Sequence, residues 1–140
     1  METIKIYTDG GSLGNPGKGA IGVVIFFNKK IKSYKIALGQ TTNNEAEYLA
    51  VIYALTKVKK LLGKEGLKKI KVILHLDSEL VGNQLLGKYK IKDTSLQKLF
   101  IRFWNLKIDF ADLEIKIIPR EENKVADSLV KEALFSKKLF

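Results

Sequence analysis

The sequence contains no cysteine, which excludes disulfide bonds and thiolate metal sites. It has a single histidine, His75, so a bound metal would depend mainly on oxygen ligands, the donors that Mg²⁺ and Mn²⁺ prefer. No run of about 18 apolar residues is present to span a membrane, and the first residues alternate like a strand rather than a signal peptide. We therefore expect a cytoplasmic protein without membrane contact.

Arginine is scarce, since Arg102 and Arg120 are the only two, yet lysines bring the formal net charge to +10. A basic surface attracts polyanions such as nucleic acids, but a lysine-rich surface can also serve solubility alone. Of the 140 residues, 46% are hydrophobic, which is enough for a packed core. This length predicts one domain, residues 1–140, and we expect a monomer.

The first 40 residues predict three strands. Residues 4–8 alternate between apolar and polar side chains, and Asp9 is expected to end this strand. The segment 10–19 is rich in turn residues, and strands are predicted at 21–27 and 32–38. Short connections between them predict an antiparallel meander.

The rest of the chain alternates between helices and strands. Thr42 and Glu45 have the spacing of a capping box and predict a helix start, which places Glu47 near its first turn. The connection 63–69 leads into a strand at 70–76, which is followed by Asp77. Further elements are predicted as helices at 78–86, 96–104 and 123–135 and a strand at 113–117.

This order predicts an α/β fold with a five-stranded mixed sheet and helices on both faces. Strands joined through a helix are expected to be parallel, so the first, fourth and fifth strands should be parallel neighbours. Ligands of open α/β sheets bind at the carboxyl ends of parallel strands. Asp9 and Asp77 are predicted at such ends.

A single aspartate after a strand is commonly structural, but a pair is more informative. Two carboxylates about 4 Å apart repel by roughly 4 kcal/mol at an effective dielectric near 20, and a divalent cation between them removes this cost. Glu47 and Asp127 are expected at the same end of the sheet. Four acids around hard cations suit two-metal displacement at phosphorus.

The sequence resembles type 1 ribonuclease H across essentially its whole length. Four segments resemble that family's motifs and occur in the family's order: Thr8–Gly17, Thr42–Glu47, Asp77–Glu79 and Asn123–Asp127. The resemblance implies a ribonuclease H-like fold and an endonuclease that cuts the RNA strand of RNA–DNA hybrids without sequence preference, leaving 3′-hydroxyl and 5′-phosphate ends.

The same resemblance implies the roles of individual residues. Asp9, Glu47, Asp77 and Asp127 would hold two Mg²⁺ ions, for which Mn²⁺ could substitute. The residues implied to contact the hybrid are Gly10, Gly11, Asn15, Thr42, Asn43 and Asn44. Polar groups there would read the RNA 2′-hydroxyl. Thr42 has a second interpretation as the helix N-cap, and double-stranded RNA is a second candidate substrate.

Two departures from the best-known bacterial form affect these expectations. The segment Gly87–Thr94 is short where that form has a basic protrusion, so the chain resembles compact variants and a weaker or differently arranged grip on substrate is expected. The loop before the last helix lacks that form's histidine, and its resemblance to the compact variants implies a product-release role for Arg120, whose position would also let it contact the phosphate. A surface ion pair with Glu121 or Glu122 is the alternative for this arginine.

Three further alternatives stay open from the sequence. His75 is expected to be a buried core histidine rather than a catalytic one. Another nuclease or a strand-transferase on the same fold is the first rival function, which the Asn43–Asn44 pair disfavours. A non-catalytic hybrid-binding module is the second, and the retained carboxylates argue against it.

Overall fold

The computed structural model describes residues 2–135, which form one five-stranded sheet with helices on both faces. The strand order is β3-β2-β1-β4-β5. The strands are β1 (Glu2–Gly14), β2 (Gly17–Phe27), β3 (Lys30–Thr41), β4 (Ile70–Leu76) and β5 (Asp112–Ile117). The helices are α1 (Asn43–Leu67), α2 (Glu79–Leu85), α3 (Thr94–Lys107) and α4 (Lys124–Phe135), with a short 3-10 turn at Arg120–Glu122.

The pairing of the strands is the predicted one. β1 pairs antiparallel with β2, and β2 pairs antiparallel with β3. β4 lies parallel to both β1 and β5. The mixed sheet inferred from the order of elements is therefore confirmed.

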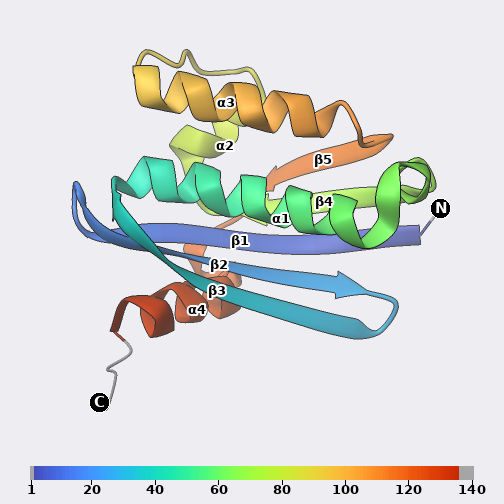
Figure 1. Ribbon diagram of the computed structural model, residues 1–140, viewed down its shortest axis with the longest axis horizontal. Coiled ribbons are helices and arrows are strands. Elements are labelled where there is room, and N and C mark those ends of the chain that lie inside the picture. Colours follow the sequence, from blue (N-terminus) through green and yellow to red (C-terminus); the bar gives the residue numbers. More distant parts are fainter. Residues whose placement is uncertain (1, 136–140) are drawn as a thin grey trace.

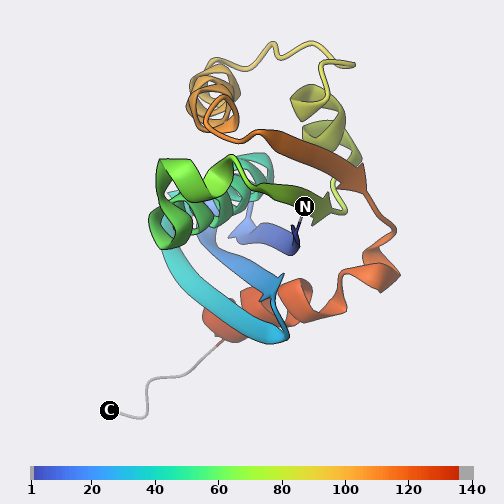
Figure 2. The same ribbon diagram turned by 90° about the vertical axis from the view of Figure 1, so that its right-hand side faces the viewer.

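The helices make two unequal layers around the sheet. α1 packs along β1 and β2 on one face, α3 lies against α1, and α4 covers β1, β2 and β3 on the opposite face (Figure 1). The turned view shows α1 and α3 on one side of the strands and α4 on the other (Figure 2). Within residues 2–135, no helix is both long enough and apolar enough to cross a membrane.

The glycine-rich segment after Asp9 is strand rather than loop, so the predicted end of the first strand is wrong. β1 continues to Gly14, and β2 begins at Gly17. The reason is pairing with β2, which continues from Gly10 opposite Ile21 to Gly14 opposite Gly17. A Cβ on Gly10 would lie 2.3 Å from the carbonyl oxygen of Ala46 in α1, so glycine lets the strand approach the helix backbone.

Helix α1 begins as predicted and ends differently. Thr42 is its N-cap, and the reciprocal hydrogen bonds with Glu45 that define a capping box are both present. The predicted break at Gly63 is only a kink, because Gly63 has φ 70° and helix resumes through Leu67.

Two apolar side chains that helical periodicity places on the packed faces of their helices are exposed. Trp104 of α3 is 45% exposed, and Val125 at the start of α4 is 59% exposed. Strand β4 is not fully buried, because Lys71 and Ile73 alternate as half-buried residues with the buried Ile70, Val72 and Leu74. His75 is buried as predicted, with its Nδ1 2.9 Å from the carbonyl oxygen of Ile6 and its ring stacked on Tyr7.

Candidate active site

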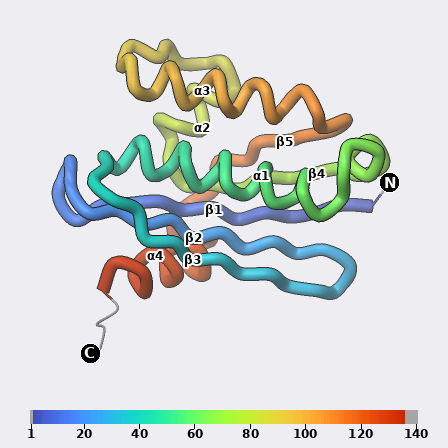
Figure 3. Tube along the Cα trace, in the orientation of Figure 1, coloured from blue at the N-terminus to red at the C-terminus, as the bar shows by residue number. Residues whose placement is uncertain are grey.

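Two aspartates meet where the parallel ladder between β1 and β4 ends. The last paired residues are Tyr7 and His75, so continuing the register by two residues places Asp9 beside Asp77. Asp9 lies within β1, whose hydrogen bonding continues only toward β2 at this point. The start of α1 and the turn between β1 and β2 lie at this same end of the sheet (Figure 3). The sheet topology thus aligns carboxylates 68 residues apart in sequence.

Glu47 completes a three-carboxylate cluster with these aspartates. Carboxylate oxygens of Asp9, Glu47 and Asp77 all lie within 4.8 Å of one another. Asp9 and Glu47 are buried, whereas Asp77 is half-buried. The backbone N–H of Gly10 donates to Glu47 Oε1 at 3.1 Å, which fixes the glutamate against the strand.

The cluster is electrostatically strained in the absence of a cation. Burial, together with the charges of Asp77 and Asp127, raises the pKa of Asp9 to about 6. Burial and the neighbouring charge of Asp9 raise the pKa of Glu47 well above its usual range. Two buried acids that resist ionisation side by side indicate a place for positive charge.

The donor set fits a hard divalent cation. All three groups offer carboxylate oxygens, and the buried Oε2 of Glu47 has no hydrogen-bond partner. An ionised oxygen left unpaired in the interior is costly, and a cation would satisfy it. Asp9, Glu47 and Asp77 are therefore the residues that would hold such an ion.

Asp127, the fourth predicted acid, lies on the wall of the same cavity but outside the three-carboxylate cluster. It sits in the first turn of α4, and its Oδ2 accepts from Lys131 Nζ at 3.0 Å. The structure therefore brings the four predicted acids to one end of the sheet, with three of them in mutual contact range.

Sequence reasoning missed Asn123 as a site residue. Its side chain is 1% exposed, and its Nδ2 donates both to the Thr8 carbonyl and to Asp77 Oδ2, each at 2.8 Å. These bonds tie the start of α4 to β1 and orient Asp77. The residue stood in a recognised motif, but the sequence held no signal that its amide would reach a carboxylate 46 positions away.

Four of the six predicted substrate residues line the cavity with the acids. Gly10, Gly11, Asn43 and Asn44 line an open cavity of about 590 Å³ together with the four acids and Arg120. Asn15 is not part of this lining. It acts indirectly, because its Oδ1 accepts from the Asn43 backbone N–H at 2.9 Å at the start of α1. Asn43 Oδ1 in turn accepts from Ser12 N–H at 2.9 Å.

The structure also gives the positions of Thr42 and Arg120, whose roles toward substrate stay predictions. Thr42 caps α1, with its Oγ1 accepting from Glu45 N–H at 3.1 Å. Arg120 lies on the cavity wall, and no ion pair within residues 2–135 involves it. Ser12, Glu79 and Lys131 also line the cavity and were not predicted.

We expect the metal-free protein to lose stability as pH rises. The pKa of Asp9 and that of Glu47 are raised in the folded state, so between about pH 4 and the folded-state values the folded protein binds more protons than the unfolded one. Stability therefore falls across this window, by roughly 1–3 kcal/mol. Glu47→Gln should flatten this fall, and millimolar Mg²⁺ should reverse it at pH 7. Thermal unfolding with EDTA or Mg²⁺ from pH 4 to 8 measures both. An unchanged pH profile in Glu47→Gln would show that the acids are not strained.

Comparison with known proteins agrees with this geometry. Residues 7–133 match the family model described as Reverse transcriptase-like. Ribonuclease HI of Halobacterium salinarum is 36% identical over 133 residues, covering 94% of this chain and 64% of that protein. The bifunctional protein Rv2228c of Mycobacterium tuberculosis is 34% identical over 134 residues, and the chain spans only 35% of its length.

Solved structures show the same fold. LC11-RNase H1, isolated from compost by a metagenomic approach, superposes with a TM-score of 0.88 at 42% identity, covering 96% of both chains. The same enzyme has been solved in complex with an RNA/DNA hybrid, and that structure gives a TM-score of 0.86 at 41% identity, covering 94% of this chain and 96% of that one. The chain therefore belongs to the Reverse transcriptase-like family and is a ribonuclease H-like domain, as its four motifs predicted.

Proposed function

We propose that this protein is an endonuclease that hydrolyses the RNA strand of RNA–DNA hybrids with two divalent cations, leaving 3′-hydroxyl and 5′-phosphate ends. The observation that carries the proposal is the cluster of Asp9, Glu47 and Asp77, with Asp127 on the same cavity wall. Mg²⁺ bound by these carboxylates would supply an activated water and stabilise the leaving oxygen, and Mn²⁺ would substitute. The complex of the 41% identical LC11-RNase H1 with an RNA/DNA hybrid supports the choice of substrate.

The protein's own residues prepare the site for a phosphodiester. Gly10 and Gly11 line the cavity with backbone atoms, which a polynucleotide backbone can approach closely. The Gly10 N–H and the Asn123 amide hold the carboxylates of Glu47 and Asp77 in fixed positions. A site whose ligands are already oriented loses little entropy when substrate binds.

Discrimination of RNA from DNA is assigned to the start of α1. The Oδ1 atoms of Asn15 and Asn43 already accept hydrogen bonds inside the protein. Asn15 therefore positions Asn43 from outside the cavity, whereas the Nδ2 group of Asn43 and the side chain of Asn44, both of which line the cavity, are the parts that would donate to a 2′-hydroxyl. Recognition would follow the shape of the hybrid rather than its base sequence.

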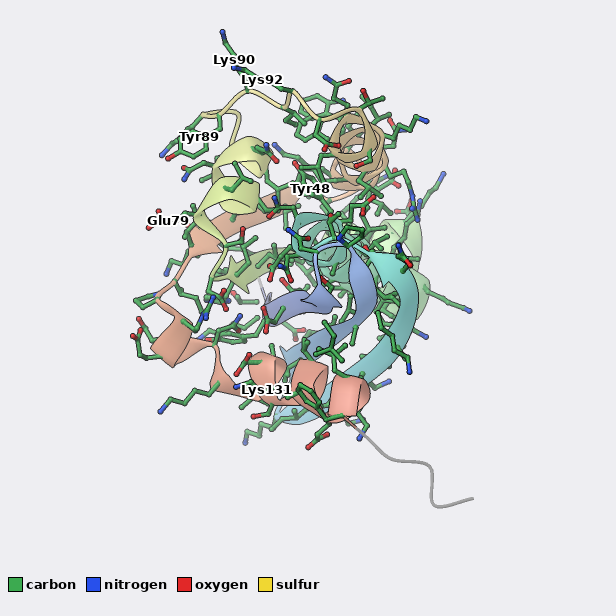
Figure 4. The ribbon with its side chains drawn as sticks, turned by 90° about the vertical axis from the view of Figure 1, so that its left-hand side faces the viewer. Tyr48, Glu79, Tyr89, Lys90, Lys92 and Lys131 are labelled. Carbon is green, nitrogen blue, oxygen red and sulfur yellow. The ribbon has the colours of Figure 1, made fainter. Side chains whose placement is uncertain are left out.

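A lysine-bearing connection supplies further attraction for a polyanion. Lys88, Lys90 and Lys92 are exposed between α2 and α3, and Lys90 and Lys92 point away from the protein (Figure 4). The connection is held by side-chain amides, because Gln84 Nε2 donates to the Lys90 carbonyl at 3.3 Å and Gln97 Nε2 to the Ile91 carbonyl at 2.7 Å. Such charges would add salt-dependent affinity without sequence preference.

A substrate panel tests the proposal and its rivals. Labelled RNA–DNA hybrid, duplex DNA and duplex RNA are incubated with the protein, with and without Mg²⁺. We expect Mg²⁺-dependent cleavage of the RNA strand of the hybrid and no cleavage of duplex DNA. Cleavage of duplex RNA would add the second candidate substrate. Cleavage of duplex DNA would favour the other nuclease, and binding without cleavage would favour the hybrid-binding module. The cytoplasmic location, the monomeric state and the single domain of residues 1–140 stay predictions.

Arg120→Ala is expected to reduce turnover about tenfold or more, equivalent to ~1.4 kcal/mol of transition-state stabilisation. The guanidinium lines the cavity and keeps its charge at neutral pH, so it can hold a phosphate but cannot serve as a general base. Arg120→Lys should recover part of the loss, because ammonium lacks the planar fork. Arg102→Ala is the matched control, since Arg102 is the other arginine and lies on α3 outside this cavity. Equal steady-state kinetics for Arg120→Ala and Arg102→Ala would show that Arg120 has no role in the reaction.

A further inference from the structure

The ammonium of Lys131 lies beside the metal site. Lys131 and Asp127 are four residues apart on α4, with Nζ 3.0 Å from Oδ2, and both line the cavity that holds the three-carboxylate cluster. Figure 4, which looks onto this end of the sheet, labels Lys131 on α4 and Glu79 at the start of α2, on two sides of the central strands. The pair joins a positive charge to the one predicted metal ligand that stands apart from the other three.

We propose that Lys131 is the resident counter-ion of this site, a positioning residue that sets the Mg²⁺ concentration at which the site fills. This inference rests on the metal-binding part of the proposed function. In the metal-free protein, the ammonium of Lys131 balances the charge of Asp127, with which it is paired. When a cation draws Asp127 toward the other three acids, we expect the contact between Lys131 and Asp127 Oδ2 to loosen or open.

The geometry suits a contact that can open. The side chains of Lys131 and Asp127 are 65% and 32% exposed, so water can replace each partner. Exposed pairs at this helical spacing stabilise a helix only slightly, so α4 does not depend on the contact. Asp9 and Glu47 are buried, whereas the partly exposed side chain of Asp127 can reorient at low cost.

The electrostatic effect on a divalent cation is larger than the effect on the helix. As a guide to scale, a unit positive charge about 6 Å from a divalent cation, in a dielectric near that of water, weakens binding of the cation roughly tenfold before salt screening. Removing the charge should therefore favour metal binding. Dissolved salt should reduce the difference, because at roughly 0.5 M monovalent salt the screening length falls to about 4 Å.

The test is a Mg²⁺ titration of the metal-free protein, followed by the rise in Tm and by calorimetry. Lys131→Met should lower the midpoint of the titration roughly three- to tenfold at low salt, and this difference should shrink at high salt. Lys131→Arg should keep the wild-type midpoint. Lys124→Met, at an exposed lysine on the same helix outside the cavity, is the matched control and should also leave the midpoint unchanged.

The possible outcomes separate this inference from the proposed function. An identical midpoint in wild type and Lys131→Met, or an equal shift in Lys124→Met, would overturn the role of Lys131 while leaving the metal site in place. A wild-type Tm that does not respond to Mg²⁺ would overturn both. The inference is supported if only Lys131→Met lowers the midpoint, Lys131→Arg keeps the wild-type midpoint, and high salt reduces the difference. A purely structural role of Lys131 would not produce this dependence on charge and salt.

Discussion

Asp9→Asn is expected to reduce cleavage of RNA–DNA hybrid by about 10³-fold or more while the protein stays folded. Asp9 is the acid most central to the site, because it contributes to the three-carboxylate cluster and lies beside Asp77 at the end of the parallel ladder. Losing one ligand charge removes several kcal/mol of cation and transition-state stabilisation, and ~4 kcal/mol corresponds to about 10³-fold in rate.

Although Asp9→Asn loses activity, it should not lose stability. Burial raises the pKa of Asp9 to about 6, so at pH 7 the metal-free protein holds a buried charge that asparagine lacks. The variant should therefore melt at the same or a higher temperature than wild type in EDTA. Initial rates under excess Mg²⁺, with Tm measured in parallel, test both parts.

Asp112→Asn is the matched control for this substitution. Asp112 is an exposed aspartate at the start of β5, outside the cavity, so both rate and Tm should stay at wild-type values. Asp93 is a poorer control, because its carboxylate caps α3 by accepting from Leu96 N–H at 3.1 Å. Full activity of Asp9→Asn would contradict a mechanism in which the carboxylate cluster binds the catalytic cations.

The elements that the sequence predicted well are those whose signals are local. The capping box at Thr42 and Glu45 placed the start of α1, and the short apolar run at Ile70–Leu76 placed β4 at its observed bounds. The order of elements was then enough to assign parallel and antiparallel pairing, because connections through helices have a preferred hand. These signals depend on residues within a few positions of each other.

The features that could not be predicted depend on distant contacts. The glycines after Asp9 resemble a turn in sequence, yet they lie in a strand that pairs with β2, and Gly10 packs closely against the backbone of α1. Trp104 and Val125 are exposed because neighbouring elements do not extend far enough to cover them, and helical periodicity cannot predict how far neighbouring elements extend. Likewise, the pairing of Asp127 with Lys131 and the bond from Asn123 to Asp77 follow from rotamers and from the position of α4.

The four acids were predicted as a set, but their different environments were not. Sequence gave no basis for separating the buried Asp9 and Glu47 from the half-exposed Asp77 and Asp127. The difference arises because β1 and α1 are central elements, whereas Asp77 follows β4 and Asp127 stands on a helix at the edge of the cavity. Burial then decides which carboxylates resist ionisation without a cation.

Gly10→Ala is expected to destabilise the protein by about 3 kcal/mol or more, equivalent to a fall in Tm of roughly 10 °C for a domain of this size. A Cβ at this position would lie 2.3 Å from the Ala46 carbonyl oxygen and 2.7 Å from the Glu47 nitrogen, both in the backbone of α1. A flexible side chain could move aside, but a helix backbone cannot, so α1 would have to shift away from β1.

Gly11→Ala is the matched comparison for this prediction, because it adds the same methyl group to the next residue of the same strand. Its Cβ would meet Val130 Cγ1 at 3.7 Å and Asn43 Oδ1 at 3.8 Å, which are ordinary contacts. The Tm of Gly11→Ala should stay within a few degrees of wild type, with a slight gain where alanine restricts the unfolded chain. Because a shift of α1 also carries Glu47 away from the Gly10 N–H, only Gly10→Ala should lose the Mg²⁺-dependent rise in Tm. Equal melting temperatures for the two variants would mean that β1 and α1 do not pack as closely as the structure places them.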